Sequence, residues 1–403
     1  MKIILVGPYP EDISCIKGGT ESSVYGLANE LAKQHEVVVI DYPRVNGHDA
    51  QEQGAAVAKR SSPILTVYRF RTLGKHYEDA VSRLKDIQRL ITDFRPDAVH
   101  IHGTHRFCYH LYRWCKKQYI STMLTVHGLA AVEKRNALKH RFSLKALYQY
   151  VRQSFYERRL LTLADRCIVD TGYVKEAIEQ YGLNRVPQMY VIPQGINDRF
   201  FHIKPSDKRA NRKIILSVGT MSTRKGRMQL LQAFDHVCLT VPDAELVIAG
   251  VNKDKTTYRQ MLSYISASPN KERITLYPDI PQDELLQLYA DAHLFALHTQ
   301  EESQGIVFAE AMAAGLPVAA TRVGGVPYVI NSADDEPNHR KAISNEPTGL
   351  LCTFNNIPQM AEQIVRLLTS DGLYGRLSAN AIKEAQYYNW TTIADKILQL
   401  YKN

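Results

Sequence analysis

The sequence lacks several features that would each point to a particular class of protein. No run of eighteen apolar residues occurs among its 403 residues, so we expect no transmembrane helix. The start, MKIILVGPYP, has only a short apolar run before Gly7, which predicts a buried first strand and not a signal peptide. The six cysteines form no Cys-x-x-Cys pair and no zinc spacing, and we interpret them as reduced, packing thiols of a cytosolic chain.

The Gly-x-Gly-x-x-Gly fingerprint is also missing after every predicted strand, which counts against a nicotinamide- or flavin-dependent oxidoreductase. The composition is that of a folded globular protein, because 45% of the residues are hydrophobic and 23% are charged. It excludes a largely disordered or collagen-like chain. The length exceeds one ordinary domain and predicts about two or three.

The net charge of +9 is confined to the first half of the chain. Residues 1–195 carry 28 Lys and Arg against 19 Asp and Glu, whereas residues 196–403 carry 22 of each kind. Residues 134–159 alone hold 8 basic side chains and 1 acidic side chain. This asymmetry predicts an anionic partner such as a membrane surface, a lipid-linked substrate or a nucleic acid. A solvated basic face without a partner is the alternative.

Short apolar runs alternate with helical patterns along the whole chain. The runs are continuous, as strands buried on both faces require. Strand–helix–strand repetition indicates parallel sheets covered by helices. The sequence therefore predicts an α/β fold of two tandem Rossmann-like, doubly wound domains. The first series of runs is Ile3–Val6, Val37–Ile40, Ala98–Ile101, Met123–Val126, Cys167–Val169 and Tyr190–Ile192, and the second is Ile214–Val218, Leu246–Ala249, Ile274–Leu276, Leu294–Leu297, Pro317–Ala320 and Leu350–Cys352.

A Pro/Gly turn within Pro193–Phe200 marks the join between the two domains. We assign residues 1–195 to the first domain and residues 196–384 to the second. The stretch His202–Arg212 is polar and lacks periodicity, which predicts a linker or surface loop. Near the end, Asn389–Tyr401 has the pattern of an amphipathic helix.

The segment Glu301–Gly325 carries the most chemistry. Gly305 opens a predicted helix, whose free N–H groups and partial positive charge suit a phosphate group. Glu310, one and a half turns into that helix, is placed to accept two hydrogen bonds from a ribose diol. Glu302, in the loop before the helix, is placed to bind sugar hydroxyls. Two surface carboxylates on an ordinary helix are the alternative.

The loop Ser217–Gly226 follows the first predicted strand of the second domain. Arg224 and Lys225 are placed to clamp the other side of a diphosphate. Gly219 and Gly226 permit tight turns. A basic pair at the start of a helix opposes the helix dipole, which argues that the pair has a function.

Two loops of the first domain carry further candidates. Gly18 and Gly19 stand between a predicted strand and a predicted helix, a geometry that binds anions. His127 lies at the carboxyl end of a predicted parallel strand, where open α/β sheets bind ligands. His100 and His102 have a similar place on the preceding strand, and we expect them to be mostly structural.

The ordered set of these motifs resembles the retaining glycosyltransferases of family 4, which have the GT-B fold. The resemblance covers nearly the whole chain, and the pair of glutamates eight residues apart is its most specific part. It rests on Gly18–Gly19, Arg95–Gly103, Thr125–Gly128, Val191–Asn197, Ser217–Gly226, Glu302 with Glu310, and Gly324–Pro327.

The resemblance implies that the second domain binds a nucleotide sugar, that the first domain binds the acceptor, and that residues 385–403 return to the first domain. It implies a reaction in a cleft between the domains without a metal or cofactor, in keeping with the absence of an Asp-x-Asp motif. Arg224 and Lys225 would hold the diphosphate, Glu302 the transferred sugar, and His127 its 6-hydroxyl group. The nucleotide contacts would come from Glu310, which would hold the ribose, and from Gly18, Gly19, Gly219, Ser303, Gln304, Gly305, Ile306 and Val307.

Three positions depart from the pattern of that family. Thr220 stands where Arg commonly follows the glycine of the phosphate loop, and Arg224 beside Lys225 is the expected compensation. Gln194 replaces a common Asn, and Tyr328 replaces a common acidic residue. The resemblance also implies front-face attack, with the diphosphate helping to deprotonate the acceptor, so no nucleophile is assigned.

A helix over Arg141–Leu161 would gather basic side chains in one stripe beside an apolar face. Such an arrangement suits an anionic membrane surface, which makes residues 134–159 a candidate membrane contact of a peripheral protein. The alternative is a helix that packs its apolar side on the sheet. The stripe comprises Arg141, Lys145, Arg152 and Arg159, and the apolar face comprises Leu144, Leu147, Val151 and Phe155.

The leading hypothesis is a cytoplasmic glycosyltransferase, placed at the inner face of the membrane, that moves a sugar from a UDP- or GDP-sugar to a glycan or lipid-linked acceptor in cell-surface polysaccharide synthesis. A second hypothesis is a soluble sucrose- or trehalose-type synthase with the same donor site and a small acceptor, against which the uneven charge argues. A third is a basic nucleic-acid-binding protein, which leaves the phosphate motifs unexplained, so we expect no nucleic-acid partner.

Overall fold

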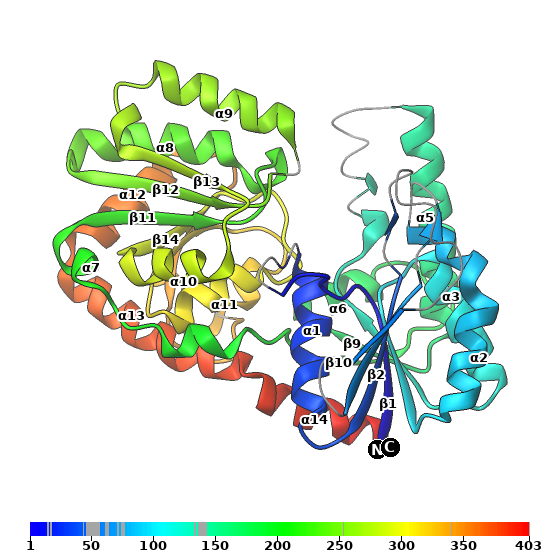
Figure 1. Cartoon of the computed structure of the whole chain (residues 1–403). Coiled ribbons are helices and arrows are strands. Elements are labelled where there is room, and N and C mark those ends of the chain that lie inside the picture. The colour runs from blue at the N-terminus through cyan, green and yellow to red at the C-terminus, as the bar shows by residue number, and fades with distance from the viewer. Residues whose placement is uncertain are drawn as a thin grey trace. The chain divides into compact units, whose positions relative to one another are not determined.

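The chain forms two compact units, and each is described by itself (Figure 1). The first unit comprises Met1–Glu11, Gly18–Pro193 and Thr391–Asn403, and the second is mainly Gln194–Trp390. The computed structural model describes residues 1–13, 16, 18–42, 44–45, 57–60, 64–70, 72–73, 77–132, 134–135, 143–252, 254–339 and 341–402.

The first unit is built on an eight-stranded sheet with the strand order β10-β9-β8-β7-β1-β2-β5-β4. Neighbouring strands are parallel except at the edge, where β4 pairs antiparallel with β5. The strands are β1 (Lys2–Val6), β2 (Glu36–Asp41), β4 (Val57–Arg60), β5 (Leu65–Arg69), β7 (Ala98–His102), β8 (Thr122–Val126), β9 (Arg166–Val169) and β10 (Gln188–Val191), and a separate short pair is formed by β3 (Arg44–Val45) and β6 (Thr72–Leu73).

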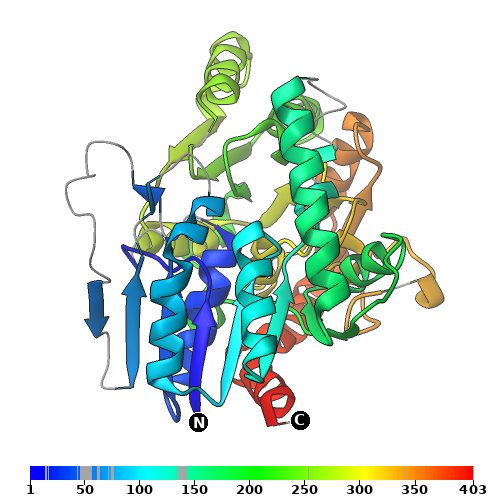
Figure 2. The same cartoon turned by 90° about the vertical axis from the view of Figure 1, so that its right-hand side faces the viewer.

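Helices cover both faces of this sheet, which is why its central strands are continuous apolar runs. The helices α2, α3, α5 and α6 share one core with alternate strand residues such as Ile4 and Val99. Figure 2 shows α2, α3 and α5 side by side on that face, and Figure 1 shows α1 and α14 on the other. The helices are α1 (Gly19–Leu31), α2 (Leu84–Phe94), α3 (Arg106–Lys117), α5 (Leu144–Leu163), α6 (Gly172–Glu179) and α14 (Trp390–Lys402).

The C-terminal amphipathic pattern forms α14, which packs on the first unit. The Tyr401 hydroxyl lies 2.6 Å from Nδ1 of His100 on β7. A guanidinium N–H of Arg166, on β9, donates to the Leu400 carbonyl oxygen at 3.1 Å. These two contacts fix the end of the helix to the sheet.

The second unit has a six-stranded parallel sheet with the order β13-β12-β11-β14-β15-β16. Its faces carry two separate cores: α10, α11 and α13 pack on one face, and α8, α9 and α12 pack on the other. The strands are β11 (Lys213–Val218), β12 (Ala244–Gly250), β13 (Ile274–Pro278), β14 (Leu294–Leu297), β15 (Val318–Thr321) and β16 (Gly349–Cys352). The helices are α7 (Asp207–Asn211), α8 (Arg227–Thr240), α9 (Lys255–Ala267), α10 (Gln282–Asp291), α11 (Ile306–Ala313), α12 (Ile357–Thr369) and α13 (Asp371–Ala385).

Each sheet reverses its strand order once, between β1 and β7 in the first unit and between β11 and β14 in the second. Open α/β sheets bind their ligands beside the carboxyl ends of strands at such a reversal. A ligand site is therefore expected in the loops after these strands and after the adjacent β8 and β9.

The stretch His202–Arg212 is not the linker or surface loop that its polar composition predicts. It contains α7, and Arg209 on that helix is buried in the second unit. The Arg209 guanidinium donates to the carbonyl oxygens of Tyr289, Ala290 and Ala314 at 2.5, 3.2 and 2.8 Å. The prediction failed because a basic side chain in a polar stretch gives no sign that carbonyl oxygens from elsewhere in the fold surround it.

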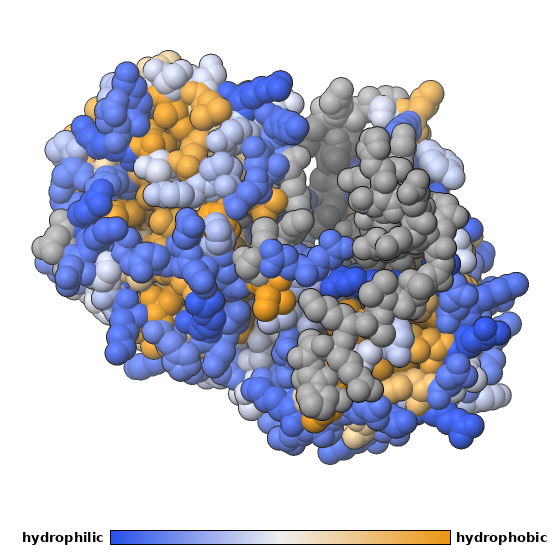
Figure 3. All heavy atoms as spheres, viewed as in Figure 1, coloured by the Kyte–Doolittle hydropathy of each residue, from blue (hydrophilic) through white to orange (hydrophobic). Residues whose placement is uncertain are grey.

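Polar side chains cover most of the face drawn in Figure 3, as expected for helices with one buried side. Cysteine does not contribute to that surface in the part of the chain that the structure describes. Its five cysteines there are all free and buried, whereas Cys15 lies outside the described residues.

Candidate active site

A first candidate site lies at the strand reversal of the second unit, where two loops meet. The loop after β11 runs from Gly219 to Gly226, and the loop after β14 runs from His298 to Gly305. The Gln300 amide donates to the Arg224 carbonyl oxygen at 2.9 Å, so the two loops are tied together through their backbones. This contact brings the residues predicted from two separate motifs into one place.

Lys225 and Glu302 form an ion pair across these loops, and both side chains are about nine-tenths buried. The hydroxyl group of Thr299 lies 3.4 Å from the same carboxylate oxygen of Glu302. Burial lowers the pKa of Lys225, and the attraction of Glu302 opposes that shift. The alternative in which Glu302 is an ordinary surface carboxylate is therefore wrong.

Arg224 lies beside this pair but is exposed. Its guanidinium donates to the Glu301 carbonyl oxygen at 3.2 Å. The two cations predicted as a clamp thus differ: one is buried and neutralised by a carboxylate, and the other is open to solvent.

Two glycines allow the close approach of these loops. A Cβ atom on Gly226, whose φ is +58°, would lie 1.6 Å from the His298 carbonyl oxygen. A Cβ atom on Gly325 would lie 1.8 Å from the Ser303 carbonyl oxygen, and the Gly325 amide donates to the Glu302 carbonyl oxygen at 2.7 Å. The backbone around Glu302 is therefore held from both sides by positions that accept no side chain.

Arg227 is a residue of this site that the sequence reasoning missed. It is fully buried, and its guanidinium donates to Ser217 Oγ at 2.7 Å and to the carbonyl oxygens of Gly219 and Thr220 at 2.6 and 3.3 Å. Burial lowers the pKa of Arg227 to about 10, which leaves it charged at neutral pH. The loop that has Thr at position 220 is therefore built around Arg227, seven residues later. In the sequence, the only sign of this role is that Arg227 stands at the start of a predicted helix.

The N-terminus of α11 follows directly on Glu302. Gly305 caps the helix, and the amides of Ile306 and Val307 in its first turn have no carbonyl oxygen four residues earlier within the helix. Ser303 precedes the cap and is partly buried. These groups are the predicted diphosphate contacts, and the structure places them beside the buried Lys225–Glu302 pair.

Glu310 lies on α11 and is partly exposed. One carboxylate oxygen accepts a hydrogen bond from the Tyr289 hydroxyl at 3.0 Å. Burial raises the pKa of Glu310 to about 7, and burial also raises the pKa of Tyr289. Glu310 is therefore a carboxyl group that changes charge near neutral pH, held by one donor and able to accept others.

Gln304, a predicted nucleotide contact, has its side-chain amide engaged elsewhere. Its Oε1 accepts from the Gln194 amide at 2.8 Å, and its Nε2 donates to the Gln194 carbonyl oxygen at 3.1 Å. The side chain thus anchors the beginning of the second unit to the loop before α11. Only the backbone of Gln304 is left for a ligand.

A second candidate site lies at the carboxyl ends of β7, β8 and β9 in the first unit. Nδ1 of His127 lies 3.2 Å from Oδ2 of the buried Asp170, and Nε2 of His127 lies 3.0 Å from Nδ1 of His102. Because a carboxylate only accepts, Nδ1 of a neutral His127 carries the proton and Nε2 accepts from His102. Nε2 of His102 is then an acceptor, and it is buried without a hydrogen-bond partner in the described structure.

The two histidines on β7 have different roles. His100 is buried and lies 2.6 Å from both Thr125 Oγ1 and the Tyr401 hydroxyl, which is the structural role expected of it. Burial lowers the pKa of His100 to about 3 and also lowers the pKa of His102, so both rings stay neutral. His102, by contrast, contacts His127 and belongs to the candidate site, which the sequence reasoning did not foresee.

Gly18 and Gly19 lie at the N-terminus of α1 and are exposed. The Gly18 backbone is extended, with φ −175°, and a Cβ atom there would meet no atom within 4 Å. The pair therefore presents an open helix N-terminus after β1, but the fold does not require glycine at position 18.

Two family models match this chain. Residues 17–200 match the family Glycosyltransferase Family 4, and residues 198–384 match the family Glycosyl transferases group 1. The two matches together run from residue 17 to residue 384. The chain therefore belongs to the GT-B glycosyltransferases of family 4, group 1.

Individual relatives share about a quarter of their residues with the matched part of this chain. D-inositol 3-phosphate glycosyltransferase of Xylanimonas cellulosilytica is 25% identical over 259 residues, which cover 61% of this chain and 58% of that protein. Mannosylfructose-phosphate synthase of Agrobacterium fabrum is 28% identical over 237 residues, which cover 55% of this chain and 49% of that protein. The chain thus spans about half to two thirds of the length of the curated relatives it matches.

Solved structures confirm the predicted fold of two doubly wound domains. Sucrose-phosphate synthase of Thermosynechococcus elongatus has a TM-score of 0.79 and 22% identity, with 100% of this chain and 98% of that chain covered. Anabaena HepE in complex with UDP and glucose has a TM-score of 0.70 and 16% identity, with 100% of both chains covered. A trehalose-phosphate synthase of Burkholderia xenovorans in complex with glucose-6-phosphate has a TM-score of 0.72 and 12% identity, again with 100% of both covered.

The described residues contain neither a metal-binding cluster nor a membrane-spanning helix. No group of three or more His, Cys, Asp and Glu side chains there is arranged to hold a metal ion. No helix in that part of the chain combines the length and the apolar character needed to span a bilayer.

Proposed function

We propose that this chain is a retaining glycosyltransferase that moves a sugar from a UDP- or GDP-sugar to a small phosphorylated sugar or polyol. One observation carries the proposal. The loops after β11 and β14 bring a buried lysine, a buried glutamate and a helix N-terminus together at the strand reversal of the second unit. Family membership gives this arrangement its meaning.

The donor would be held by basic groups and amides at its diphosphate and by carboxylates at its hydroxyl groups. The diphosphate would accept hydrogen bonds from the first amides of α11 and interact with Lys225 and Arg224. Glu310 would accept hydrogen bonds from the ribose diol, and Glu302 would bind hydroxyls of the transferred sugar. The first unit would hold the acceptor and present His127 toward the sugar. This division of roles, with residues 1–195 on the acceptor side and residues 196–384 on the donor side, is part of the proposal.

The reaction would form a bond between an acceptor oxygen and the anomeric carbon on the face that the diphosphate leaves. The electron pair of the broken C–O bond passes to the diphosphate, which also takes the proton of the acceptor hydroxyl. Lys225 and the α11 amides would stabilise the charge that develops on the diphosphate. No side chain is needed as a nucleophile, and metal independence stays a prediction.

The acceptor class is supported by the names of the relatives. One relative acts on D-inositol 3-phosphate, another is a mannosylfructose-phosphate synthase, and two structural neighbours are sucrose- and trehalose-phosphate synthases. A common element of these names is a sugar or polyol phosphate. We therefore prefer a small acceptor to the glycan acceptor of the leading hypothesis from the sequence.

The test is a thermal-shift screen with UDP, GDP, ADP and their sugars, because a ligand that binds only the folded chain raises its melting temperature. The stabilising donor is then incubated with inositol 3-phosphate, glucose 6-phosphate and fructose 6-phosphate, and the anomeric configuration of any product is read by NMR. Stabilisation by one nucleotide and a product with retained configuration support the proposal. Absence of stabilisation by every nucleotide and sugar nucleotide would overturn it.

A second candidate function is favoured by one observation on the first unit. Leu144, Leu147, Val151 and Phe155 on α5 are exposed, so the alternative in which this apolar face packs on the sheet is wrong. Arg141, the first member of the predicted basic stripe, lies outside the described residues. An exposed apolar face beside arginines would suit a peripheral enzyme that meets a lipid-linked acceptor at the inner face of a membrane, as in polysaccharide synthesis. Flotation with anionic vesicles separates this candidate from the first, and the cytoplasmic location stays a prediction.

A further inference from the structure

Over residues 144–157, the helix α5 turns polar side chains inward and exposes apolar ones, whereas Leu160 and Leu161 near its C-terminal end are buried in the core. Glu157 is fully buried and accepts hydrogen bonds from Thr104 Oγ1 at 2.6 Å, from the Tyr181 hydroxyl at 2.9 Å and from the Ala131 amide at 3.3 Å. Gln153, also buried, donates to the Thr104 carbonyl oxygen at 3.2 Å. These bonds fix which face of the helix points outward.

The outward face of α5 carries a stripe of large apolar side chains. Because the members recur every three or four residues, they lie along one line of the helix. Leu144 is 78% exposed and Tyr148 is 63% exposed, so neither side chain belongs to the core. The stripe comprises Leu144, Leu147, Tyr148, Val151 and Phe155. Continued by two further turns, the same line reaches Thr162 at the C-terminal end of the helix.

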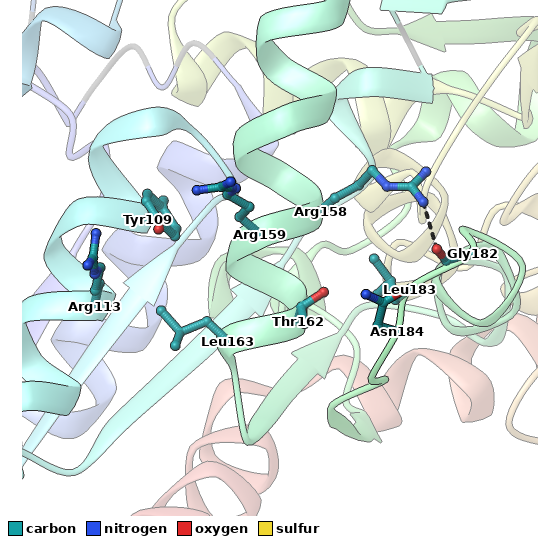
Figure 4. A pocket seen from close by; sticks show the side chains of 9 residues that line it. All are labelled: Tyr109, Arg113, Arg158, Arg159, Thr162, Leu163, Gly182, Leu183 and Asn184. Carbon is teal, nitrogen blue, oxygen red and sulfur yellow. Dashed lines mark hydrogen bonds between the residues drawn. The ribbon is translucent and has the colours of Figure 1, made fainter.

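A hollow of about 460 Å³ lies at that end (Figure 4). Figure 4 shows Thr162 between Arg158 and Arg159, which point to opposite sides of α5, with Arg113 and Tyr109 of α3 on the side of Arg159. Arg158 donates to the Gly182 carbonyl oxygen at 2.6 Å. Leu163, Gly182, Leu183 and Asn184 complete the lining. The hollow is thus rimmed by three guanidinium groups, and its polar groups include a hydroxyl, a phenol and an amide.

The positive charge of the hollow is not neutralised by the protein. None of the ion pairs among the described residues includes Arg113, Arg158 or Arg159. The Arg159 guanidinium instead lies 4.3 Å from the ring centre of Phe155, which links the hollow to the apolar stripe. Such a stacked arginine keeps its N–H groups free at the edge of the guanidinium plane.

The hollow is separate from the candidate active site. Its residues Leu163 and Asn184 precede β9 and β10, at the amino ends of the strands. His127 follows β8, at the carboxyl ends. A ligand bound in the hollow would therefore lie at the opposite edge of the sheet from His127.

We infer that the hollow binds the phosphate group of an anionic phospholipid head group while the apolar stripe of α5 enters the outer part of the same bilayer. The charge of the rim is complementary to a phosphate, and guanidinium groups bind phosphate with directed, bidentate hydrogen bonds. An apolar stripe flanked by arginines is the pattern of a helix that lies in a membrane interface. The inference rests on the second candidate function only in placing α5 at a membrane, and it names the lipid group that is recognised.

The experiment is flotation of the full chain with vesicles of phosphatidylcholine alone and with vesicles that also contain phosphatidylglycerol. Four double variants are compared with the natural chain. Arg113→Gln with Arg159→Gln changes the hollow, Leu144→Ser with Val151→Ser changes the stripe, and Lys396→Gln with Lys402→Gln removes the same charge from α14. Arg113→Lys with Arg159→Lys keeps the charge and removes the forked geometry. Melting temperatures and stabilisation by a sugar nucleotide show that each variant is folded and that the donor site is intact.

We expect the natural chain to bind only the vesicles with phosphatidylglycerol, and the two glutamines in the hollow to weaken that binding about thirtyfold. The lysine variant should restore part of the binding, and the α14 variant should bind about as well as the natural chain. Equal losses in the hollow and α14 variants would reduce the effect to net charge and overturn the inference. Stabilisation by inorganic phosphate through the same arginines, without vesicle binding, would assign the hollow to a free anion and also overturn it. Loss of binding in the stripe variant alone would leave the membrane contact standing and refute the role of the hollow.

Discussion

The Nζ atom of Lys225 is paired with the carboxylate of Glu302 inside the second unit, although the family resemblance assigns Lys225 to the diphosphate and Glu302 to the transferred sugar of the donor. A diphosphate near Lys225 would share its charge with Glu302, and a sugar near Glu302 would find a carboxylate already oriented by Lys225. The pair is thus a structural element of the second unit as well as a candidate contact of the donor. Its removal should affect both stability and donor binding.

Lys225→Met should destabilise the second unit by about 3–5 kcal/mol, because it leaves the carboxylate of Glu302 buried without its partner. The measurement is calorimetric unfolding, with the transition of the second unit identified by its shift on nucleotide binding. Arg224→Met is the matched control, and its exposed side chain should change stability by no more than about 0.5 kcal/mol. The double variant Lys225→Met with Glu302→Gln should recover part of the loss. Equal melting temperatures for the two single variants would contradict a structural role of the pair.

Affinity for a sugar nucleotide should rise as the pH increases through about 7, because burial raises the pKa of Glu310 to about 7 and only its carboxylate form accepts two ribose hydroxyls. Nucleotide sugars are the right ligands, since their diphosphate does not titrate in that range. Glu310→Gln should bind about 10- to 100-fold more weakly at high pH and should lose the pH dependence. Titration calorimetry at several pH values reads both effects, and an unchanged pH profile in the variant would exclude Glu310 as the titrating group.

The same carboxyl group should influence the stability of the protein, measured without added nucleotide, in the opposite direction. Its pKa in the folded state is raised above the ordinary value of 4.5, so the folded chain binds this proton more tightly than the unfolded chain does. The resulting stabilisation is complete below about pH 4.5 and is lost as the pH rises through about 7. Comparison of the natural chain with Glu310→Gln over this window isolates the contribution.

Asp170→Asn should lower kcat/KM about 10- to 100-fold, because Asp170 accepts from Nδ1 of His127 and thereby fixes its tautomer. Affinity for the sugar nucleotide should change little if the donor is held by the second unit. Nitrogen chemical shifts of the His127 ring report the tautomer directly. Asp165→Asn is a suitable control, since Asp165 is exposed and pairs with Lys116 and Arg185 away from the histidines. Full activity of the Asp170→Asn variant would show that the orientation of His127 by Asp170 does not contribute to catalysis.

Gly226→Ala should destabilise the second unit by about 2 kcal/mol or more, since its Cβ atom would lie 1.6 Å from the His298 carbonyl oxygen and φ is +58°. Gly375→Ala, in the interior of α13, meets no atom within 4 Å and should stabilise the helix by up to about 1 kcal/mol. Thermal unfolding of both variants gives the comparison. A tolerated alanine at position 226 would show that the two loops are not held as closely as described.

Part of this molecule followed from local pattern. Continuous apolar runs such as Ile3–Val6 and Leu294–Leu297 predicted strands at these places, because a strand buried on both faces must be apolar throughout. The edge strand β4 and its neighbour β5 were missed; Leu65–Arg69 alternates apolar and polar residues and lies among charged segments. Spacing also selected Gly305, Glu302 and Glu310, because a helix N-terminus after a buried strand is a recognisable place for a phosphate.

The partners of those residues depended on the tertiary structure. Nothing local to position 227 distinguishes a solvated arginine from one that binds three loop oxygens, and the same holds for the contact between His102 and His127. These contacts join segments whose distance in space is set by the order of strands in the sheet and by the packing of helices on it.

The helix α5 shows most clearly which features follow from the sequence and which depend on the tertiary structure. The sequence predicts a helix over Arg141–Leu161 with a basic stripe beside an apolar face, since that pattern depends only on the 3.6-residue period, and the structure has α5 over Leu144–Leu163. The sequence did not determine which side is buried. The hydrogen bonds of Glu157 to Thr104 and Tyr181 turn Glu157 inward and leave the stripe from Leu144 to Phe155 in solvent, because donors from distant elements compensate the cost of burying a carboxylate. Periodicity fixed the helix, and contacts between distant segments fixed its orientation.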